Sequence, residues 1–481
     1  MDEKLTNLQI GALLHDIGKI VRRAGKAGKN RHSKAGAEYL ENRELLDIEK
    51  YKEVYNMIKY HHNEEISEND KLEGSSLAYL IYEADNIASG VDRVKYDDEI
   101  CDEGDKKQVK KNEGLPLNSI FNKLNVQKNN IEKNFKSLKY DRLSFNIPKK
   151  KIDEKKIEKE QYLDNVLKQL KEDLEEMKEK DLLTPEKLNS VLEESCVYFP
   201  SSSYVDYPDV PYYDHVKLTA AVAVCMYIYD MEKGNNRDYK NKYFKKSQKK
   251  EREKTKFLFV SGEFTGIQNF IYTITSKMAM KSLRGRSFYL ELFIEHIIDE
   301  ILEALNLSRV NLIYSAGSQF YMLLPNIPKT IEILENYKKI VNDFLLKELG
   351  TSVYYEISYT ETSAEELGNK LSENIKKENQ IKEIFKRNSI ETSRKKLNRY
   401  SEKQLEEIFD EDSDLNKIYN DTKECVICKK SEKEEILIKN SQNESNGNIE
   451  ICDSCKNYIK LGRDISKSFH QKRTFFMEKN C

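Results

Sequence analysis

Residues 11–20, GALLHDIGKI, place an ionisable pair, His15 and Asp16, inside an apolar run. Burying such groups without partners is costly, so the run needs a reason to carry them. A divalent metal ion is a sufficient reason, because neutral imidazole and carboxylate are both good metal ligands. The chain has only seven histidines, and four of them fall close together near its start, followed by an acidic candidate in a helical segment: His15, His32, His61, His62 and Asp85.

The segment that carries these residues is predicted to be helical. Across residues 1–95, apolar side chains recur at spacings of three and four, which is typical of amphipathic helices. Adjacent side chains on a helix point about 100° apart, so His61 and His62 need not both be ligands. For any single histidine the alternative is an ordinary hydrogen-bonded core or surface residue. The clustering of four favours a metal site.

Length and charge limit the classes of protein to consider. At 481 residues the chain should hold two to four domains. Charged residues make up 34% of it, and no apolar run is long enough to cross a membrane, so we expect a soluble protein. The polar, acidic start MDEKLTNLQI lacks the features of a secretory signal. The formal net charge of −2 means that any nucleic-acid binding must come from local patches.

A basic linker divides the chain into two regions with different hydrophobic periods. Beyond it, strands are predicted at 256–260, 310–314, 320–324 and 352–359, and helices at 264–275, 287–305 and 330–349. The order β-α-β-β-α-β is that of a ferredoxin-like domain, the core of polymerase palm domains. The prediction is an α+β multidomain protein with these segments: 1–98, the metal-binding all-α core; 99–190, a charged helical insertion; 191–232, a helical segment packing with that core; 233–255, the basic linker; 256–361, the ferredoxin-like domain; and 362–481, a small helical zinc-binding domain.

Four of the eight cysteines form two CxxC pairs, Cys425 with Cys428 and Cys452 with Cys455. Paired thiolates at this spacing are typical of a closed tetrahedral zinc site, which is structural because no coordination position stays open. A thiol redox pair would not need the second CxxC. The other four cysteines are scattered, which fits a reducing cytoplasm better than a disulfide framework.

The pattern HD…H…HH…D resembles the HD phosphohydrolase superfamily. In that family, ligands from several helices hold one or two metal ions, and an activated water attacks a phosphodiester or phosphomonoester. The resemblance implies that Asp16 bridges or anchors metal, that the histidines and Asp85 complete the site, and that Lys19 steadies a phosphate. Many HD enzymes carry a histidine well before the HD pair, but none precedes His15 here. That ligand is absent, replaced, or supplied from later in the chain.

Almost the whole chain resembles a more specific family. HDIGK, YEADNIASGVDR, YYDHVKLTAAVAV, GEFTGIQNFIY, KSLRGRSFYLEL, NLIYSAGSQFYMLLPN and the CxxC pairs, in this order, are similar to the large subunit of type III-A CRISPR (Csm) effector complexes. The resemblance implies an HD nuclease that cuts single-stranded DNA with Mn²⁺, Ni²⁺ or Co²⁺. It also implies a complex with CRISPR RNA, target RNA and the small and backbone Csm subunits. In the family, a pair of palm domains joins ATP into cyclic oligoadenylates with a GGDD motif.

This chain departs from the family at that motif. It contains no GGDD, and its one Asp-Asp pair, Asp97–Asp98, lies beside the HD segment. Because family members continue beyond their zinc motif, we expect the N-terminal part of such a subunit: a truncated form, a broken gene or half of a split subunit. Cyclase activity would then need a second palm from a partner. The first palm would contribute half of an ATP/Mg²⁺ site through candidate residues for phosphate, base and ribose: Arg284, Arg286, Ser287, Asn311 and Gly317. The alternative is that LRGR is a structural turn.

A basic stretch lies between the ligand candidates. Residues 21–34, VRRAGKAGKNRHSK, carry six cations and no acid. A Gly-containing basic loop beside a metal site suits a single-stranded polyanion, and a solvated surface loop is the alternative. The DNA-binding candidates are Arg22, Arg23, Lys26, Lys29, Arg31 and Lys34.

The leading hypothesis is therefore a metal-dependent single-strand DNase. In it a metal hydroxide attacks phosphorus and the 3′ oxygen leaves. An HD-type nucleotide phosphohydrolase is a second hypothesis, against which the palm and zinc modules argue. A non-enzymatic scaffold with a vestigial HD site is a third, and metal content would separate it from the first.

Overall fold

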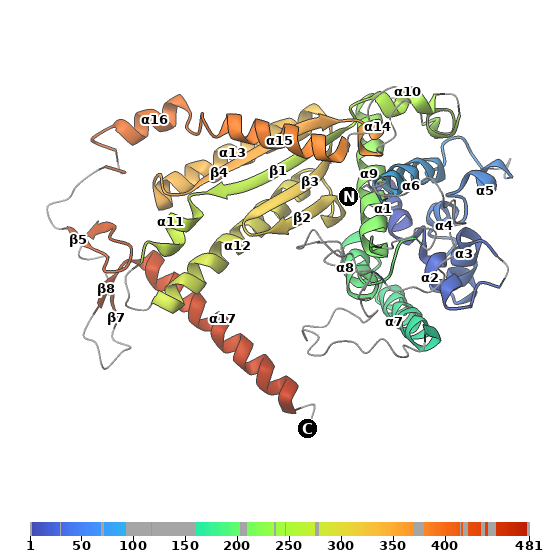
Figure 1. Cartoon of the computed structure of the whole chain (residues 1–481), viewed down its shortest axis with the longest axis horizontal. Coiled ribbons are helices and arrows are strands. Elements are labelled where there is room, and N and C mark those ends of the chain that lie inside the picture. The colour runs from blue at the N-terminus through green and yellow to red at the C-terminus, as the bar shows by residue number, and fades with distance from the viewer. Residues whose placement is uncertain are drawn as a thin grey trace, which may run out of the picture.

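The structure is a computed structural model, and Figure 1 shows it as an elongated molecule with helices at one end and a sheet at the other. The residues that it describes are 2–28, 30–68, 72–92, 117, 159–202, 209–234, 237–245, 247–274, 279–368, 380–413, 415–416, 422–433, 438–440 and 449–478. Most of the predicted charged insertion, and Lys29 of the basic stretch, lie outside the described residues.

The helical half is built from nine helices among the described residues. They are α1 (Glu3–Leu14), α2 (Ile17–Arg23), α3 (His32–Asn42), α4 (Lys52–Lys59), α5 (Asn63–Ser67), α6 (Ala78–Asp92), α7 (Lys159–Glu179), α8 (Pro185–Cys196) and α9 (Tyr212–Glu232). Local signals set several ends: the Asp2 side chain caps α1 by accepting from Lys4 N, and Thr184 caps α8 ahead of Pro185. The core of this half is apolar and includes Leu8, Ile10 and Leu13 of α1.

Helix α9 lies at the centre of the molecule, between the helical half and the sheet (Figure 1). It packs against α1 and α6 on one side and against β3 and the 3₁₀ turn η3 (Arg309–Asn311) on the other. A helix covered on opposite sides must be apolar around its circumference, and the sequence AAVAVCM at 220–226 meets that requirement with every residue buried.

The other half contains a four-stranded antiparallel sheet. Its strands are β1 (Phe257–Thr265), β2 (Leu312–Ala316), β3 (Gln319–Pro325) and β4 (Tyr354–Thr362), in the spatial order β2-β3-β1-β4. The register aligns Phe257 with Pro325 on one side and with Thr362 on the other. Helices α11 (Ile267–Tyr272), α12 (Ala279–Ala304) and α13 (Pro328–Leu349) complete the β-α-β-β-α-β order expected from the sequence, with the first helix in two pieces.

Helices α11 and α12 differ most from their predicted extents. The expected helix 264–275 is shorter, because β1 continues to Thr265 and pairs with β4 before α11 begins. The expected helix 287–305 begins earlier, so LRGR lies within α12 and not in a turn. Gly285 in that motif has a tertiary reason: a Cβ there would stand 1.8 Å from the carbonyl oxygen of Tyr458 in α17 (Asp453–Glu478), which crosses α12 at this point.

The predicted basic linker contains regular structure. It holds the single π-helical turn η2 (Lys240–Phe244) and α10 (Gln248–Glu253), and Tyr239 and Tyr243 are buried. After the sheet come α14 (Ala364–Leu367), α15 (Gln380–Lys395) and α16 (Glu402–Phe409), which are helical as expected for this region. Helix α15 packs on β1 and β4, on the face of the sheet where Phe259 meets Phe385.

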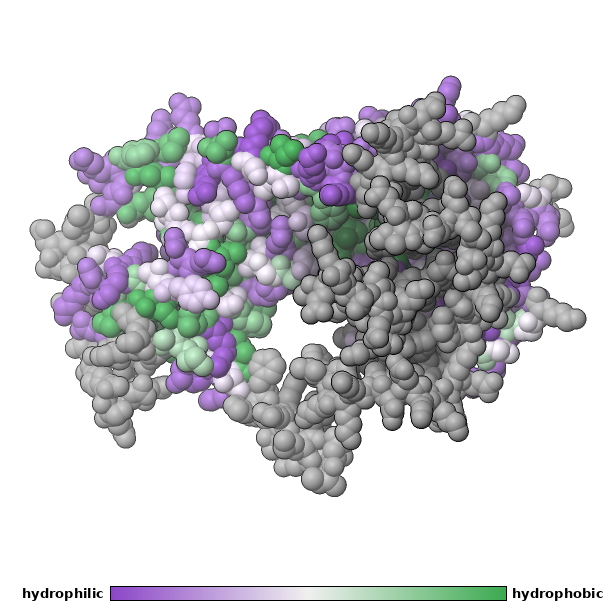
Figure 2. Space-filling view, viewed as in Figure 1, coloured by the Kyte–Doolittle hydropathy of each residue, from purple (hydrophilic) through white to green (hydrophobic). Residues whose placement is uncertain are grey.

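The cysteine pairs lie in a small module at the far end of the sheet domain. Its strands form two short hairpins, β5 (Thr422–Glu424) with β6 (Ser431–Lys433) and β7 (Ile438–Asn440) with β8 (Ile449–Ile451), and α17 follows. In Figure 2 the coloured surface over the sheet half is a mixture of hydrophilic residues and hydrophobic patches. Among the described residues, no helix combines the length and the apolar character needed to cross a membrane.

Candidate metal centres

The first group of candidate ligands comes from four helices. His15 is the C-cap of α1, Asp16 is the N-cap of α2, Asp85 is on α6, and His215 is in the first turn of α9. All four are buried, and their ligand atoms lie within 4.8 Å of one another. His215 Nε2 stands 3.1 Å from Asp85 Oδ1 and 3.3 Å from Asp16 Oδ2, while His15 Nε2 is 3.4 Å from Asp16 Oδ2.

The second group consists of three histidines. His32 begins α3, His61 follows α4, and His62 is the N-cap of α5. Their ligand nitrogens also lie within 4.8 Å of one another, and the Nε2 atoms of His32 and His62 are 2.7 Å apart. Because His61 and His62 are not in a helix, the expected divergence of adjacent helical side chains does not apply, and both face this group.

Asp16 stands between the two groups. Its Oδ2 faces His15 and His215, whereas its Oδ1 lies 3.2 Å from His32 Nε2 and 3.7 Å from His61 Nε2. One carboxylate therefore presents a separate oxygen to each group. Lys19, one helical turn along α2, donates a hydrogen bond to Oδ2, which holds the carboxylate in this orientation.

The ligand atoms of these groups are suited to bind divalent metal ions. His15 Nδ1 is 2.6 Å from the carbonyl oxygen of Ala12, and His61 Nδ1 is 2.7 Å from that of Ile58. An N–H donated there leaves the lone pair on Nε2, directed into the site. Within the described part of the chain, His15 Nε2, His61 Nε2 and Asp16 Oδ1 form no hydrogen bond although they are buried. Buried polar atoms of this kind are costly, and bound cations would satisfy them.

The electrostatics differ between the two groups. Burial alone would lower the pKa of His15, but the nearby carboxylates of Asp16 and Asp85 outweigh it and raise that pKa to about 9. Burial opposes ionisation of both carboxyls. Lys19 and the histidines nevertheless hold the pKa of Asp16 well below the usual range, and His15 and His215 do the same for the pKa of Asp85. Burial and the neighbouring histidines lower the pKa of His62 to about 2. Burial also lowers the pKa of His61, so His61 and His62 are neutral and ready to bind a metal ion, while His15 carries a proton.

The proton on His15 makes the metal affinity of the first group depend on pH. In the metal-free protein His15 must lose its proton before Nε2 can bind a cation, whereas Asp16 and Asp85 are already ionised. We expect the apparent Mn²⁺ affinity of the first group to rise by about tenfold per pH unit between about pH 6.5 and 8.5, with one proton released per ion. Calorimetric titration in buffers of different ionisation enthalpy measures both quantities. An affinity independent of pH over this interval would contradict the assignment.

Backbone contacts and a buried carboxylate position the second group. A Cβ on Gly18 of α2 would lie 1.7 Å from the carbonyl oxygen of His32, so only glycine permits this approach of α2 to α3. Buried Glu65 of α5 accepts a 2.9 Å hydrogen bond from Ser33 of α3, which ties the helix of His32 to the segment of His62. Arg31 pairs with Glu64 on the surface beside it.

His215 is the candidate ligand that the sequence reasoning did not select. It precedes an apolar helix and lies 130 positions after Asp85, so no local spacing connects it with the others. The one signal for it was the absence of a histidine before His15, which suggested that a residue later in the chain supplies that ligand. In the structure, α9 brings His215 to the first group.

The basic candidates line the α2–α3 region, and several already have protein partners. Arg23 donates to the carbonyl oxygen of Pro200 and stacks over Phe199. Lys26 Nζ is 3.4 Å from Asp164, and Arg31 pairs with Glu64. Arg22, Lys26 and Arg31 are exposed and Lys34 is half-buried, so these four can reach a ligand in solvent.

The five nucleotide candidates occupy different environments. Arg286 is buried and donates to the carbonyl oxygens of Phe270 (2.6 Å) and Thr273 (3.0 Å) and to Cys455 Sγ (3.5 Å). Asn311 is buried and donates to the carbonyl oxygen of Leu323. Arg284 is half-buried beside α17, Ser287 is exposed on α12, and Gly317 is exposed in the β2–β3 turn with φ 62°. The structure thus does not turn Arg286 and Asn311 toward solvent.

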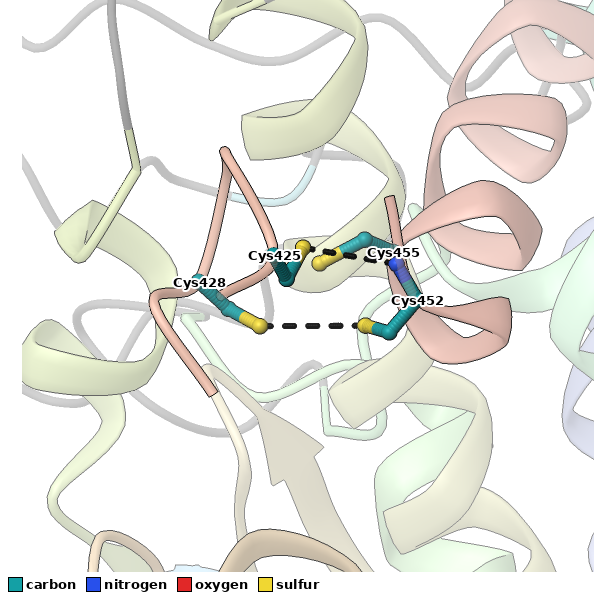
Figure 3. Close-up of side chains that lie close together, drawn as sticks. All are labelled: Cys425, Cys428, Cys452 and Cys455. Carbon is teal, nitrogen blue, oxygen red and sulfur yellow. Dashed lines mark hydrogen bonds between the residues drawn. The ribbon is translucent and has the colours of Figure 1, made fainter. Parts of the chain in front are cut away.

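The four cysteines converge as their spacing predicts (Figure 3). Their sulfur atoms lie within 4.8 Å of one another, and the Sγ atoms of Cys428 and Cys452 are 3.7 Å apart. A tetrahedron with zinc–sulfur bonds of about 2.3 Å has sulfur–sulfur edges of about 3.8 Å, so this spacing fits zinc. Cys452 N donates to Cys425 Sγ, a hydrogen bond that stabilises a thiolate.

Comparisons with known proteins agree in both halves of the chain. Residues 1–90 match the HD domain model, and residues 256–411 match the model of Csm1 subunit domain B. The single-strand-specific deoxyribonuclease Cas10/Csm1 (subtype III-A) of Enterococcus italicus is 31% identical over 97% of this chain, and that of Mycobacterium tuberculosis is 33% identical over 89%. The chain covers 58% and 54% of those two proteins, so it spans little more than half their length.

Solved structures show the same fold. Csm1 from T. onnurineus is 27% identical and superposes on 84% of this chain and 50% of its own with a TM-score of 0.60. A Csm1–Csm4 cassette in complex with one ATP is 25% identical and covers 82% of this chain and 48% of its own, also with a TM-score of 0.60.

Proposed function

Because this chain is a homologue of the Cas10/Csm1 proteins of type III-A CRISPR systems, we propose that it is a metal-dependent nuclease that cuts single-stranded DNA. The observation that carries the proposal is the pair of histidine-rich groups joined by Asp16, with buried ligand atoms that lack hydrogen bonds in the described part of the chain. A scaffold with a vestigial site would have no need for this many costly buried polar atoms.

Each group would hold one divalent transition metal, Mn²⁺, Ni²⁺ or Co²⁺, and Asp16 would contribute to both. The first ion would take His15, Asp85 and His215, and the second His32, His61 and His62. When bound, such ions supply an activated water nucleophile and offset the negative charge that develops on a phosphodiester.

The protein's own residues determine how a strand reaches the site. His15 and His61 are fully buried, whereas His32 and Lys19 have side chains that are 20% and 24% exposed. The site therefore opens on the side of His32 and Lys19, and a scissile phosphate would enter there. Lys19, held by Asp16, would contact a phosphate oxygen, and Arg22, Lys26, Arg31 and Lys34 would follow the backbone of the strand. Hydrolysis adds water across the P–O3′ bond and leaves a 5′-phosphate and a 3′-hydroxyl.

The remaining domains fit a subunit of a ribonucleoprotein. We place the sheet domain as the first palm, which would supply half of an ATP/Mg²⁺ site and need a second palm for cyclic oligoadenylate synthesis. The solved relatives include Csm1–Csm4 cassettes in complex with ATP and with cA4. By analogy the partners of this chain would be Csm subunits, CRISPR RNA and target RNA, and the four-cysteine module would hold a structural Zn²⁺.

The proposal is tested with labelled single-stranded and duplex DNA, Mn²⁺, and two histidine variants. We expect the wild type to cut only the single strand and only with Mn²⁺, and His61→Ala to cut it roughly a hundredfold more slowly. His296→Ala is the matched control, because His296 is a surface histidine of α12 that is 66% exposed, and its activity should equal that of the wild type. Equal cleavage by both variants would exclude this site, and binding of DNA without cleavage would favour the scaffold.

A further inference from the structure

Building on the proposed nuclease function, we propose that α9 couples the sheet domain to one of the two metal groups. The sheet domain contacts the middle and the C-terminal end of α9 and so fixes the position of this helix. His215 lies at the N-terminal end of the same helix. A shift of the sheet domain would therefore change the affinity of the first group for metal while leaving the second group unchanged.

The middle of α9 is attached to the sheet by hydrogen bonds. Cys225 donates from Sγ to the carbonyl oxygen of Leu323 on β3 at 3.4 Å. Asn311, which ends η3, donates to the same carbonyl oxygen at 2.8 Å and lies 3.5 Å from Cys225 Sγ. All three residues are buried, so water does not compete for these contacts. This arrangement fixes the position of α9 across β3.

The C-terminal end of α9 is held by a buried ionic cluster. The amino group of Lys256, immediately before β1, is 1% exposed and lies 3.2 Å from Asp230 of α9 and 2.7 Å from Glu251 of α10. Tyr243 of η2 donates to Asp230 at 2.6 Å and accepts from Lys256 at 2.7 Å. The cluster thus joins the start of the sheet to the end of α9. Breaking a buried charge cluster is strongly unfavourable, so the start of β1 and the C-terminal end of α9 move together.

The N-terminal end of α9 lies in the metal site. His215 is 1% exposed, and its carbonyl oxygen accepts from Thr219 Oγ1 at 2.9 Å within the helix. The 21 residues of α9 form an unbroken helix, about 30 Å long at 1.5 Å per residue. A helix of this kind moves as a unit, so a tilt imposed at Cys225 or Asp230 displaces His215 from Asp16 and Asp85.

In the part of the chain that the structure describes, the second group is held mainly within the helical half. Its histidines come from α3 and from the segment that joins α4 to α5. In the described structure, α3 and α4 make their main contacts with α1, α2, α6 and each other, all within the helical half. The coupling is therefore expected to be selective, which distinguishes it from a general loss of stability.

The experiment adds Asp230→Asn to two variants, each of which keeps only one of the two metal-binding groups. In His61→Ala only the first group remains intact, and in Asp85→Asn only the second. Mn²⁺ binding to each whole-chain protein is measured by calorimetry and by electron paramagnetic resonance. We expect Asp230→Asn to weaken Mn²⁺ binding by roughly two- to thirtyfold in the His61→Ala background and to leave it unchanged in the Asp85→Asn background.

Glu356→Gln is the matched control. Glu356 is also a buried carboxylate with a lysine partner, Lys338 at 2.8 Å, but this pair joins α13 to β4 instead of joining the sheet to α9. Glu356→Gln should leave Mn²⁺ binding unchanged in both the His61→Ala and the Asp85→Asn background. Tyr243→Phe removes one hydroxyl from the cluster and replaces Asp230→Asn if that variant does not fold.

The outcomes separate the coupling from the proposed function. Equal weakening in both backgrounds, no weakening in either, or the same pattern with Glu356→Gln would each overturn the coupling. A wild-type chain that binds no Mn²⁺ would instead contradict the proposed nuclease site.

Discussion

Asp16→Asn is expected to abolish Mn²⁺ binding at both groups and to lower single-strand cleavage by about 10³-fold or more. The reason is that both groups depend on this one carboxylate, with Oδ2 facing His15 and His215 and Oδ1 facing His32 and His61. An amide removes the negative charge and presents only one oxygen. The expected stoichiometry of tightly bound Mn²⁺ falls from two to zero.

The control for this prediction is Asp85→Asn. Asp85 lies near His15 and His215 and belongs to the first group alone, so its loss should leave one ion bound at the second group. Calorimetry for stoichiometry and gel analysis of labelled single strands for rate provide the two measurements. If Asp16→Asn lost only one ion, Asp16 would not be shared between the groups. If Asp16→Asn cut DNA at the wild-type rate, the nuclease would reside elsewhere.

Cys452→Ser is expected to release the zinc ion and to unfold the cysteine module. Among the described residues, the buried core of this module contains six side chains, five of them within or beside the CxxC pairs, so apolar burial alone cannot stabilise it. Binding of structural zinc supplies roughly 10 kcal/mol or more in comparable small modules. Unfolding of the module should also break the hydrogen bond from Arg286 to Cys455 and so weaken the packing of α17 on α12.

Zinc content by elemental analysis and limited proteolysis near residues 422–467 check this prediction. Cys196→Ala is the control, because Cys196 is a buried cysteine of the helical half that should not alter zinc content. The variant Cys452→Ser should keep single-strand cleavage, since the module lies at the opposite end of the molecule from the HD helices (Figure 1). Full zinc retention in Cys452→Ser would contradict a four-thiolate site.

Local chemistry explains which parts of the site could be predicted from the sequence. His15 and Asp16 were recognisable because ionisable residues in an apolar run need a partner, and the cysteines because a CxxC turn has a fixed geometry. His32, His61 and His62 were recognisable from their clustering, and Asp85 from the HD pattern. His215 was not, because its approach to Asp85 is determined by the packing of α9 against α1 and α6. That packing depends on tertiary contacts, which no spacing in the sequence records.

The same distinction applies to the sheet domain. The change in hydrophobic period predicted the four strands of this sheet. The strand ends were not predictable in the same way, because the end of β1 depends on its pairing with β4, a distant segment of the chain. Arg286 illustrates the limit most clearly. A sequence reader sees an arginine in a Gly-containing motif and expects a phosphate, whereas in the structure the guanidinium binds two backbone carbonyls and a cysteine.

The approach of α2 to α3 at Gly18 has a consequence for how this site can change over time. The main chain at His32 touches the main chain at Gly18, and Gly36 meets Gly18 in the same place. The distance between Asp16 and His32 is consequently set by two backbones in contact and not by the sizes of core side chains. Substitutions of apolar residues elsewhere in the helical half can leave the spacing of the two ligand groups unchanged, whereas a side chain at either glycine would force the two backbones apart.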